Sequence, residues 1–257
     1  MKLYQIDAFT DQLFSGNPAA VCPLDDWLSD DLMQQIALEN NLSETAFFVF
    51  RDGEYELRWF TPATEVDLCG HATLASAYVI FNVLNYDSGQ IIFNTRSGQL
   101  VVGKQKDFFS MDFPSQPPTA CEVPPNLIAA LGVQPEEVLS CEDLLVVFQS
   151  QNDVEQLTPV FNLLKKIPQR GVIVTAPGND ADFVSRCFFP NLGINEDPVT
   201  GSAHCTLTPY WAKRLDKTEL EAHQVSSRGG KLRCKIDGSR VVMYGQAVKY
   251  LEGLIEI

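Results

Sequence analysis

The stretch EVDLCGHAT at Glu65–Thr73 leads into ATLASAYVIFNV at Ala72–Val83, a run of apolar and small residues without a charge. Such a run predicts a helix that is buried on all sides. A related stretch, EDPVTGSAH at Glu196–His204, precedes a second predicted helix at about Ala203–Leu215. The same combination of polar loop, glycine and buried helix therefore occurs twice, and it determines the predicted fold.

Other residues recur in the same order at nearly constant distance, which indicates that the two halves are diverged copies. Arg58 and Pro62 match Arg186 and Pro190, 128 positions later; Glu65, Gly70 and Ala72 match Glu196, Gly201 and Ala203, 131 positions later; Arg96, Gly98 and Leu100 match Arg228, Gly230 and Leu232, 132 positions later.

The stretch Asp112–Asn126 holds five of the fifteen prolines and divides the chain nearly in half. Because proline fixes φ and lacks a backbone donor, we expect an extended connector here. The predicted domains are residues 1–115 and 116–247. Alternation at Glu54–Phe60 and the turn at Ser97-Gly98 indicate strands. The predicted fold class is α+β, with two pseudo-symmetric halves, each a mostly antiparallel sheet curved around one apolar helix.

The composition excludes several classes of protein. Asp and Glu number 33 against 19 Lys and Arg, and the resulting formal charge of −14 disfavours nucleic acid as a partner. No apolar run reaches the length of a membrane span. The first residues read as a strand and not as a signal peptide, so we expect seven reduced cysteines in a cytoplasmic protein. Three histidines without Cys/His ligand spacing predict no metal site.

The two glycine-containing loops are candidate anion sites. Gly70 and Gly201 permit close approach of a ligand to the backbone, and the amides of a first helical turn are free donors. If the halves pack about a pseudo-twofold axis, both helix starts face one cleft and can hold a substrate carboxylate. The alternative is that both glycines serve only as tight turns before packed helices.

Glu44 is the candidate acid/base residue. It stands directly before the apolar strand that begins TAFFV, and partial removal from water suits a carboxyl group to proton transfer. The corresponding stretch of the second half, Gly171–Thr175, has no carboxylate. A surface position at a strand start is the plainer interpretation of the pattern alone. Likewise, Asn17 either binds substrate or caps a turn.

Histidines and cysteines lie close to both loops. His71 and His204 can donate to a carboxylate or relay a proton, although histidines at such places are as often structural. Cys69 and Cys205 are candidates for the paired bases of a racemase. Buried, unreactive cysteine is the commoner role for a thiol in such a place.

Together these motifs resemble the PhzF-like (phenazine-biosynthesis) family of the diaminopimelate-epimerase-like superfamily. The matching stretches run along nearly the whole chain, and LCGHAT and EDPVTGSAH are the most specific. They are DAFT (7–10), GNPAAV (16–21), NLSETAF (41–47), RWFTP…EVDLCGHAT (58–73), EDPVTGSAHC (196–205), SSRGG (226–230) and GQAV (245–248).

The resemblance implies two mirror-like open barrels, each around a central helix, with a final strand, 248–257, that returns to the first domain. It implies Glu44, His71 and Asp197 as catalytic residues. It further implies no metal or organic cofactor, a small carboxylate-bearing substrate and a homodimer. The substrate-binding residues that we expect are Asn17, Gly70, Gly201 and Ser202.

The leading hypothesis is a cofactor-independent isomerase that moves a proton by Glu44 general acid/base catalysis. One alternative is a racemase or epimerase that uses Cys69 or Cys205. In the epimerase relatives two cysteines occupy the helix starts, whereas here glycine-histidine and glycine-serine pairs stand there. The other alternative is a non-catalytic relative that only binds a small molecule. The sequence does not identify the substrate.

Overall fold

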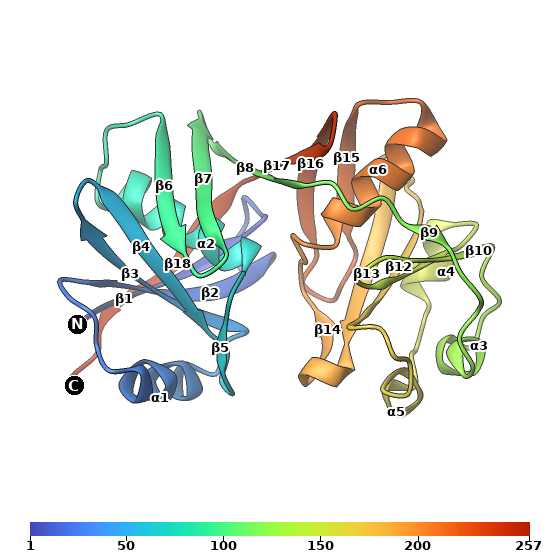
Figure 1. Ribbon diagram of the computed structural model, residues 1–257, viewed down its shortest axis with the longest axis horizontal. Helices are drawn as coiled ribbons and strands as arrows, with labels where there is room; N and C mark the ends of the chain where they lie inside the picture. Colours follow the sequence, from blue (N-terminus) through green and yellow to red (C-terminus); the bar gives the residue numbers. More distant parts are fainter. The chain divides into compact units, whose positions relative to one another are not determined.

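The computed structural model describes residues 1–257 as two compact units (Figure 1). Unit 1 comprises Met1–Asp112 together with Tyr244–Ile257, and unit 2 comprises Phe113–Met243. The boundaries thus lie a few residues before those of the predicted domains.

Unit 1 is a mixed sheet around one buried helix. Its strands are β1 (Lys2–Ala8), β2 (Asn17–Leu24), β3 (Glu44–Arg51), β4 (Glu54–Phe60), β5 (Glu65–Val66), β6 (Gln90–Thr95), β7 (Gly98–Gln105), β8 (Phe108–Pro114) and β18 (Ala247–Leu254). Its helices are α1 (Asp30–Asn40), α2 (Gly70–Tyr78) and the π-helical turn η1 (Val79–Val83).

The C-terminal strand β18 pairs with β1 in antiparallel register, and the two lie side by side in Figure 1. Strand β1 also pairs with β2, and the sheet continues through β3, β4, β6, β7 and β8. Two of these pairs, β2 with β3 and β4 with β6, are parallel. The sheet is therefore less uniformly antiparallel than the sequence pattern predicts.

The predicted buried helix is α2, and seven of its nine residues are buried. Small side chains allow the strands to approach closely, and Ser76 satisfies its hydroxyl on the carbonyl of Ala72 at 2.8 Å. Helix α1 lies on the outside of the unit. Ser29 caps α1 by accepting a hydrogen bond from the amide of Leu32.

Unit 2 contains a second sheet, one long helix and several short helices. Its strands are β9 (Thr119–Ala120), β10 (Glu137–Ser140), β11 (Leu144–Val147), β12 (Val172–Pro177), β13 (Phe183–Phe189), β14 (Ile194–Asp197), β15 (Glu219–Gln224), β16 (Gly230–Asp237) and β17 (Arg240–Gly245), the last of which crosses the unit boundary. Its helices are α3 (Leu127–Leu131), α4 (Gln151–Glu155), α5 (Phe161–Leu164), the 3₁₀ turn η2 (Pro190–Leu192) and α6 (His204–Leu215).

The strand pairing of unit 2 repeats that of unit 1. The series β10–β11–β12–β13–β15–β16 has the same alternation of parallel and antiparallel pairs as β1–β2–β3–β4–β6–β7. In each series a two- to four-residue strand, β5 or β14, pairs beside the fourth member and leads to the loop before the central helix. The predicted internal repeat is therefore present in the topology.

The proline-rich connector between the two predicted domains is tied to α6. Pro209 lies inside α6 and cannot donate to the carbonyl of Cys205 four residues earlier. The amide of Gln116 donates to that carbonyl instead, at 2.9 Å. Strand β9 of the same connector pairs with β10. The segment predicted as an extended connector is thus packed against other elements of unit 2.

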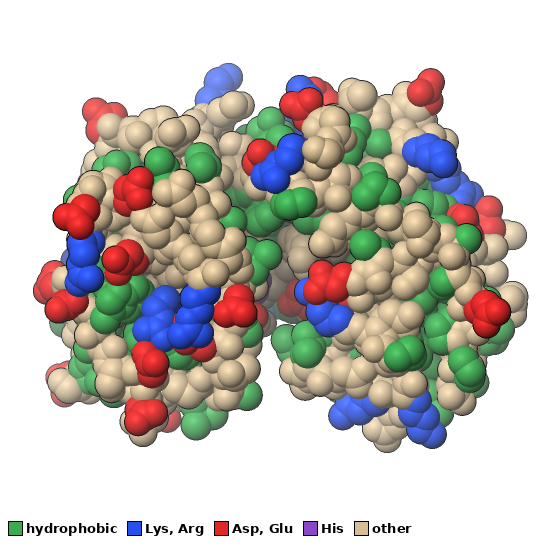
Figure 2. All heavy atoms as spheres, viewed as in Figure 1, with side chains coloured by type: hydrophobic (Ala, Val, Ile, Leu, Met, Phe, Trp, Pro, Cys, Tyr) green, Lys and Arg blue, Asp and Glu red, His purple; other side chains and the backbone are tan.

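Side chains of both charges are mixed on the surface, and the thiols are unpaired. On the face drawn in Figure 2, Lys and Arg side chains lie among Asp and Glu side chains. All seven cysteines are free thiols. No helix in the structure combines the length and the hydropathy that crossing a bilayer requires.

Candidate active site

The candidate site of unit 1 lies where β2, β3 and α2 begin. Asn17 is the first residue of β2, Glu44 the first of β3 and His71 the second of α2. The parallel pairing of β2 with β3, which places Ala19 opposite Glu44, sets both strand starts at one end of the sheet. Since α2 packs on these strands, its first turn reaches the same end.

His71 links the polar side chains of this site. Its Nε2 lies 3.1 Å from Oε2 of Glu44. Its Nδ1 lies 3.3 Å from Nδ2 of Asn17 and 3.5 Å from Sγ of Cys69. All four residues are at most 9% exposed. The sequence-predicted residues Asn17, Glu44, Gly70 and His71 therefore form one cluster.

The charges of this cluster depend on one another. Burial acts to lower the pKa of His71, but the Cys69 thiol and the Glu44 carboxylate outweigh it, and the pKa lies well above its ordinary value. Burial, aided by Glu44, raises the pKa of Cys69, while His71 and the amide of Ala72 oppose that shift. Both shifts favour the protonated forms of the imidazole and the thiol.

The start of α2 supplies amide donors next to these side chains. The first intrahelical bond runs from the amide of Thr73 to the carbonyl of Cys69 at 3.1 Å. The amides of Gly70 and His71 precede it, where a helix has its unpaired donors, whereas the amide of Ala72 faces the Cys69 sulfur. An acid/base pair beside such donors can move a proton while negative charge on a neighbouring oxygen is stabilised.

Unit 2 holds a different polar network before α6. Asp197 is the last residue of β14, and its Oδ2 accepts a hydrogen bond from Thr200 Oγ1 at 2.5 Å. Gln224 accepts from the amide of Thr200 at 2.8 Å and donates to the carbonyl of Asp197 at 2.7 Å. These three residues, all buried, fix the loop that carries Gly201 and Ser202.

An arginine lies beside the same loop. Arg170 forms two bonds to the carboxylate of Asp143, at 3.0 and 2.6 Å, and its Nη2 lies 3.4 Å from Ser202 Oγ. Burial acts to lower the pKa of Arg170, but its bonds to Asp143 raise it, so the guanidinium is firmly charged. Ser202 therefore has a cation as its neighbour.

The structure corrects one detail of the predicted anion site of unit 2. Helix α6 begins at His204, whereas Gly201, Ser202 and Ala203 form a turn before it. The amides of His204 and Cys205 bond to the carbonyls of Gly201 and Ser202, at 3.0 and 3.1 Å. Gly70, by contrast, is the first residue of α2. The two helix starts are thus not equivalent.

Sequence reasoning missed several residues of unit 2. Thr200 lies inside the predicted motif and could have been noted as a donor to Asp197. Gln224 bonds to a loop that is 24 residues away, and Arg170 lies 32 residues before Ser202. No local pattern marks such contacts. That both helix starts face one cleft, and that Asp197, Gly201 and Ser202 contact substrate, stay predictions.

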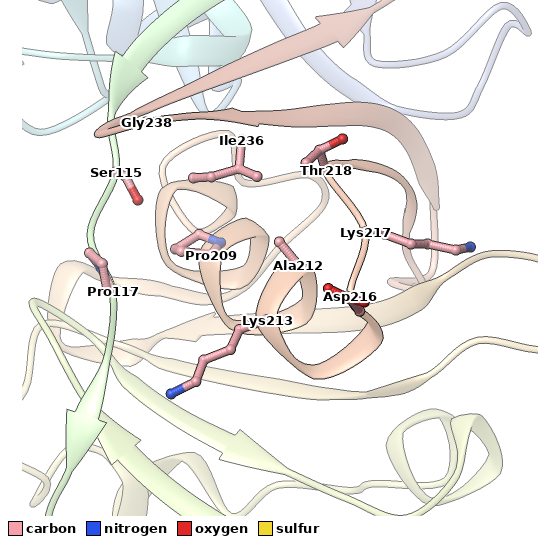
Figure 3. Close-up of a pocket in the computed structure, with 10 residues that line it drawn as sticks. All are labelled: Ser115, Pro117, Pro209, Ala212, Lys213, Asp216, Lys217, Thr218, Ile236 and Gly238. Atoms are coloured by element: carbon pink, nitrogen blue, oxygen red, sulfur yellow. The ribbon is translucent and has the colours of Figure 1, made fainter.

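A separate pocket of unit 2, about 370 Å³ in volume, lies against the C-terminal half of α6 (Figure 3). The side chains of Lys213 and Lys217 point away from each other in this view. None of the predicted site residues lines the pocket. Its lining consists of Ser115, Pro117, Pro209, Ala212, Lys213, Asp216, Lys217, Thr218, Ile236 and Gly238.

Two repeated α+β units, each with a buried helix behind a polar loop, define the diaminopimelate-epimerase-like fold. A crystal structure of a probable proline racemase from Agrobacterium radiobacter shows this fold, with a TM-score of 0.66 at 7% identity over 100% of this chain and 93% of that one. The sequence pattern of the phenazine biosynthesis-like protein family matches residues 6–253, and the chain belongs to this family.

Relatives of known sequence support this membership over the whole length. An uncharacterized isomerase of Pseudomonas aeruginosa is 54% identical over 257 residues, which cover 100% of this chain and 99% of that protein. The human phenazine biosynthesis-like domain-containing protein is 38% identical, with 99% of each chain covered. A crystal structure of a PhzF-family protein from Enterococcus faecalis has a TM-score of 0.98 at 48% identity, covering 100% and 99% of the two chains. The chain is an isomerase of this type.

Proposed function

We propose that the chain isomerises a small carboxylate-bearing metabolite by moving a proton with Glu44 as general acid and base, without a cofactor. The observation that carries the proposal is the contact of 3.1 Å between Glu44 Oε2 and His71 Nε2 in a site largely removed from water. Glu44 Oε2 and His71 Nε2 are buried and make no hydrogen bond in the structure, so the carboxylate keeps acceptor capacity for a substrate proton.

The neighbouring groups have supporting roles in this proposal. His71 orients Glu44, and Asn17 fixes the imidazole through the contact with Nδ1. The amides at Gly70 bind the oxygen on which negative charge develops when the proton leaves carbon. Asp197, Gly201 and Ser202 are proposed as further substrate contacts, which Asp197→Asn and Ser202→Ala test through their effect on KM.

The test of Glu44 begins with a substrate found by thermal shift, because a ligand that binds the folded state raises Tm. Exchange of its carbon-bound hydrogen is then followed in deuterated buffer. We expect Glu44→Gln to reduce exchange by about 10²–10⁴-fold, the usual contribution of a general base. Glu39→Gln, which alters an exposed carboxylate of α1, serves as the control. Equal deuterium incorporation by wild type and Glu44→Gln contradicts the assignment.

A second candidate function is a racemase or epimerase with Cys69 as a base. The contact of 3.5 Å between Cys69 Sγ and His71 Nδ1 favours it, because a thiol and an imidazole at this distance can share a proton. Mass mapping after iodoacetamide distinguishes the two functions. A reactive thiol that substrate protects at Cys69 favours the racemase, and an inert one favours the Glu44 mechanism. Cys205, whose pKa burial raises to about 12, is the weaker candidate.

We also propose that the chain acts as a homodimer in the cytoplasm, as the family resemblance implies. Light scattering on the purified chain gives the mass directly. A mass of one chain of 28.6 kDa at working concentration contradicts the dimer, and recovery in a membrane or exported fraction contradicts the compartment.

A further inference from the structure

We infer that Cys69 and His71 form a binding site for a soft divalent cation of the Zn²⁺ class, with Glu44 as the partner that orients the imidazole. The cation would lie between Sγ and Nδ1, which are 3.5 Å apart. Tetrahedral zinc, with Zn–S of about 2.3 Å and Zn–N of about 2.0–2.1 Å, places these two donors about 3.5 Å from each other. The cluster therefore has the donor spacing already.

The two ring nitrogens of His71 have different neighbours, as the nitrogens of a zinc-binding histidine do. Nδ1 faces the thiol, while Nε2 faces the carboxylate of Glu44 at 3.1 Å. A histidine that binds a metal commonly donates its other N–H to a carboxylate, which fixes the ring and raises its basicity. Glu44 lies at this outer position, 3.1 Å from Nε2, while the thiol lies beside the other ring nitrogen.

Negative charge and a further donor are near. A carboxylate oxygen of Glu44 lies within 4.8 Å of ligand atoms of Cys69 and His71, so the carboxylate can offset the charge of a cation that it does not bind. The amide of Asn17 contacts the same Nδ1, and a half-turn of that amide would present an oxygen in place of the nitrogen. Water or substrate would fill the remaining position, which is the pattern of an open zinc site.

Burial as an apolar packing residue is the other explanation for Cys69. Two of the four other buried thiols show the difference: the groups that shift the pKa of Cys187 and Cys234 include Thr200 and Thr208, and no imidazole. Cys69 instead faces a histidine nitrogen, and the exposed Leu68 directly before it brings the loop to the surface.

A cation on Nδ1 would displace the Asn17 contact that fixes the imidazole and would alter the imidazole that orients Glu44, so we expect the cation to inhibit the enzyme. This consequence rests on the proposed function, whereas the binding site itself does not. The two are tested by separate measurements, one spectroscopic and one kinetic.

The spectroscopic test uses Co²⁺ as a probe. Titration of the wild type is expected to give a thiolate-to-cobalt charge-transfer band that saturates at one equivalent and that Zn²⁺ abolishes. Cys69→Ser and His71→Gln should lose the band, and Glu44→Gln should bind about 10–100-fold more weakly. Cys121→Ser and Cys141→Ser, which remove the two partly exposed thiols, should keep it. A band that survives in Cys69→Ser, or no band in the wild type, overturns the site.

A second measurement avoids any change in the cluster. X-ray absorption of the zinc-loaded Cys121→Ser/Cys141→Ser chain should show a sulfur neighbour at about 2.3 Å. Neighbours of oxygen and nitrogen alone overturn the inference even if Cys69→Ser fails to fold. If zinc binds with this signature but leaves substrate deuterium exchange unchanged, the metal site stands and the catalytic role of the cluster fails.

Discussion

Gly16 directly precedes Asn17, and its backbone leaves no room for a side chain. Its φ is +69°, and an added Cβ would lie 2.2 Å from the carbonyl oxygen of Ala8. We therefore expect Gly16→Ala to lower the free energy of unfolding in two ways. Positive φ costs about 1–2 kcal/mol in an L-residue, and the clash adds about 1–3 kcal/mol. Displacement of Asn17 should also reduce deuterium exchange.

Gly53 offers a matched control for this substitution. Its φ is +87°, but an added Cβ would meet no atom within 4 Å. Urea unfolding of Gly53→Ala should therefore show the cost of positive φ alone, and its exchange activity should equal that of the wild type. Equal losses of stability in Gly16→Ala and Gly53→Ala would show that the contact with Ala8 is not limiting.

At the scale of elements, the connector and α6 depend on one hydrogen bond. Gln116 donates to the carbonyl of Cys205 because Pro209 cannot. Gln116→Pro removes this donor and leaves the carbonyl of the buried Cys205 without a hydrogen bond from the connector. We therefore expect the free energy of unfolding in urea to fall by about 1–3 kcal/mol. Glu122→Pro, at an exposed position of the same connector, should cost less. If both variants lose the same stability, proline strain and not the lost bond is responsible.

The elements also show what the sequence could predict. The sequence repeat included two arginine–glutamate pairs, Arg58 with Glu65 and Arg186 with Glu196. Each pair forms an ion pair with two hydrogen bonds in its own unit, of 2.7 and 2.7 Å in unit 1 and of 2.7 and 2.9 Å in unit 2. The buried helix α2 followed from composition. The parallel strand pairs could not be predicted in this way, because which strands pair, and in which direction, depends on contacts between segments that are distant in the sequence.

The site was predictable only in part. Motif residues gave Glu44, His71 and Asn17, which the fold of unit 1 brings together. The contact between Cys69 and His71 depends on how the first turn of α2 directs two side chains. Spacing alone therefore did not identify them as possible ligands.

At the scale of the whole molecule, one topology supports two chemically different polar clusters. Unit 1 places an imidazole, a thiol and a carboxylate at the start of α2, whereas unit 2 places an aspartate, a threonine and a glutamine before α6. The shared framework explains why the repeated residues are mostly glycine, arginine and glutamate, which shape the loops. Functional differences between the units lie in the residues that the repeat does not match.

The stability of the whole chain should depend on His204. Burial lowers the pKa of His204 to about 4, because its ring lies inside unit 2 with Nδ1 at 2.9 Å from the carbonyl of Thr200. The unfolded chain takes up this proton near pH 6.5 and the folded chain only near pH 4. The contribution of neutral His204 is therefore complete above pH 6.5 and is lost as the pH falls towards 4, by on the order of 3 kcal/mol in total.

Urea unfolding at pH 7 and pH 5 measures this loss. Carboxylates and His71 titrate as well, so the difference between wild type and His204→Gln is the informative quantity. Glutamine can still donate to the carbonyl of Thr200 but takes up no proton, so the variant should lose less stability between the two pH values. His223→Gln, at a half-buried site whose pKa burial lowers less, should change the slope less. A slope in His204→Gln equal to that of the wild type would show that His204 is already protonated, or hydrated, in the folded chain.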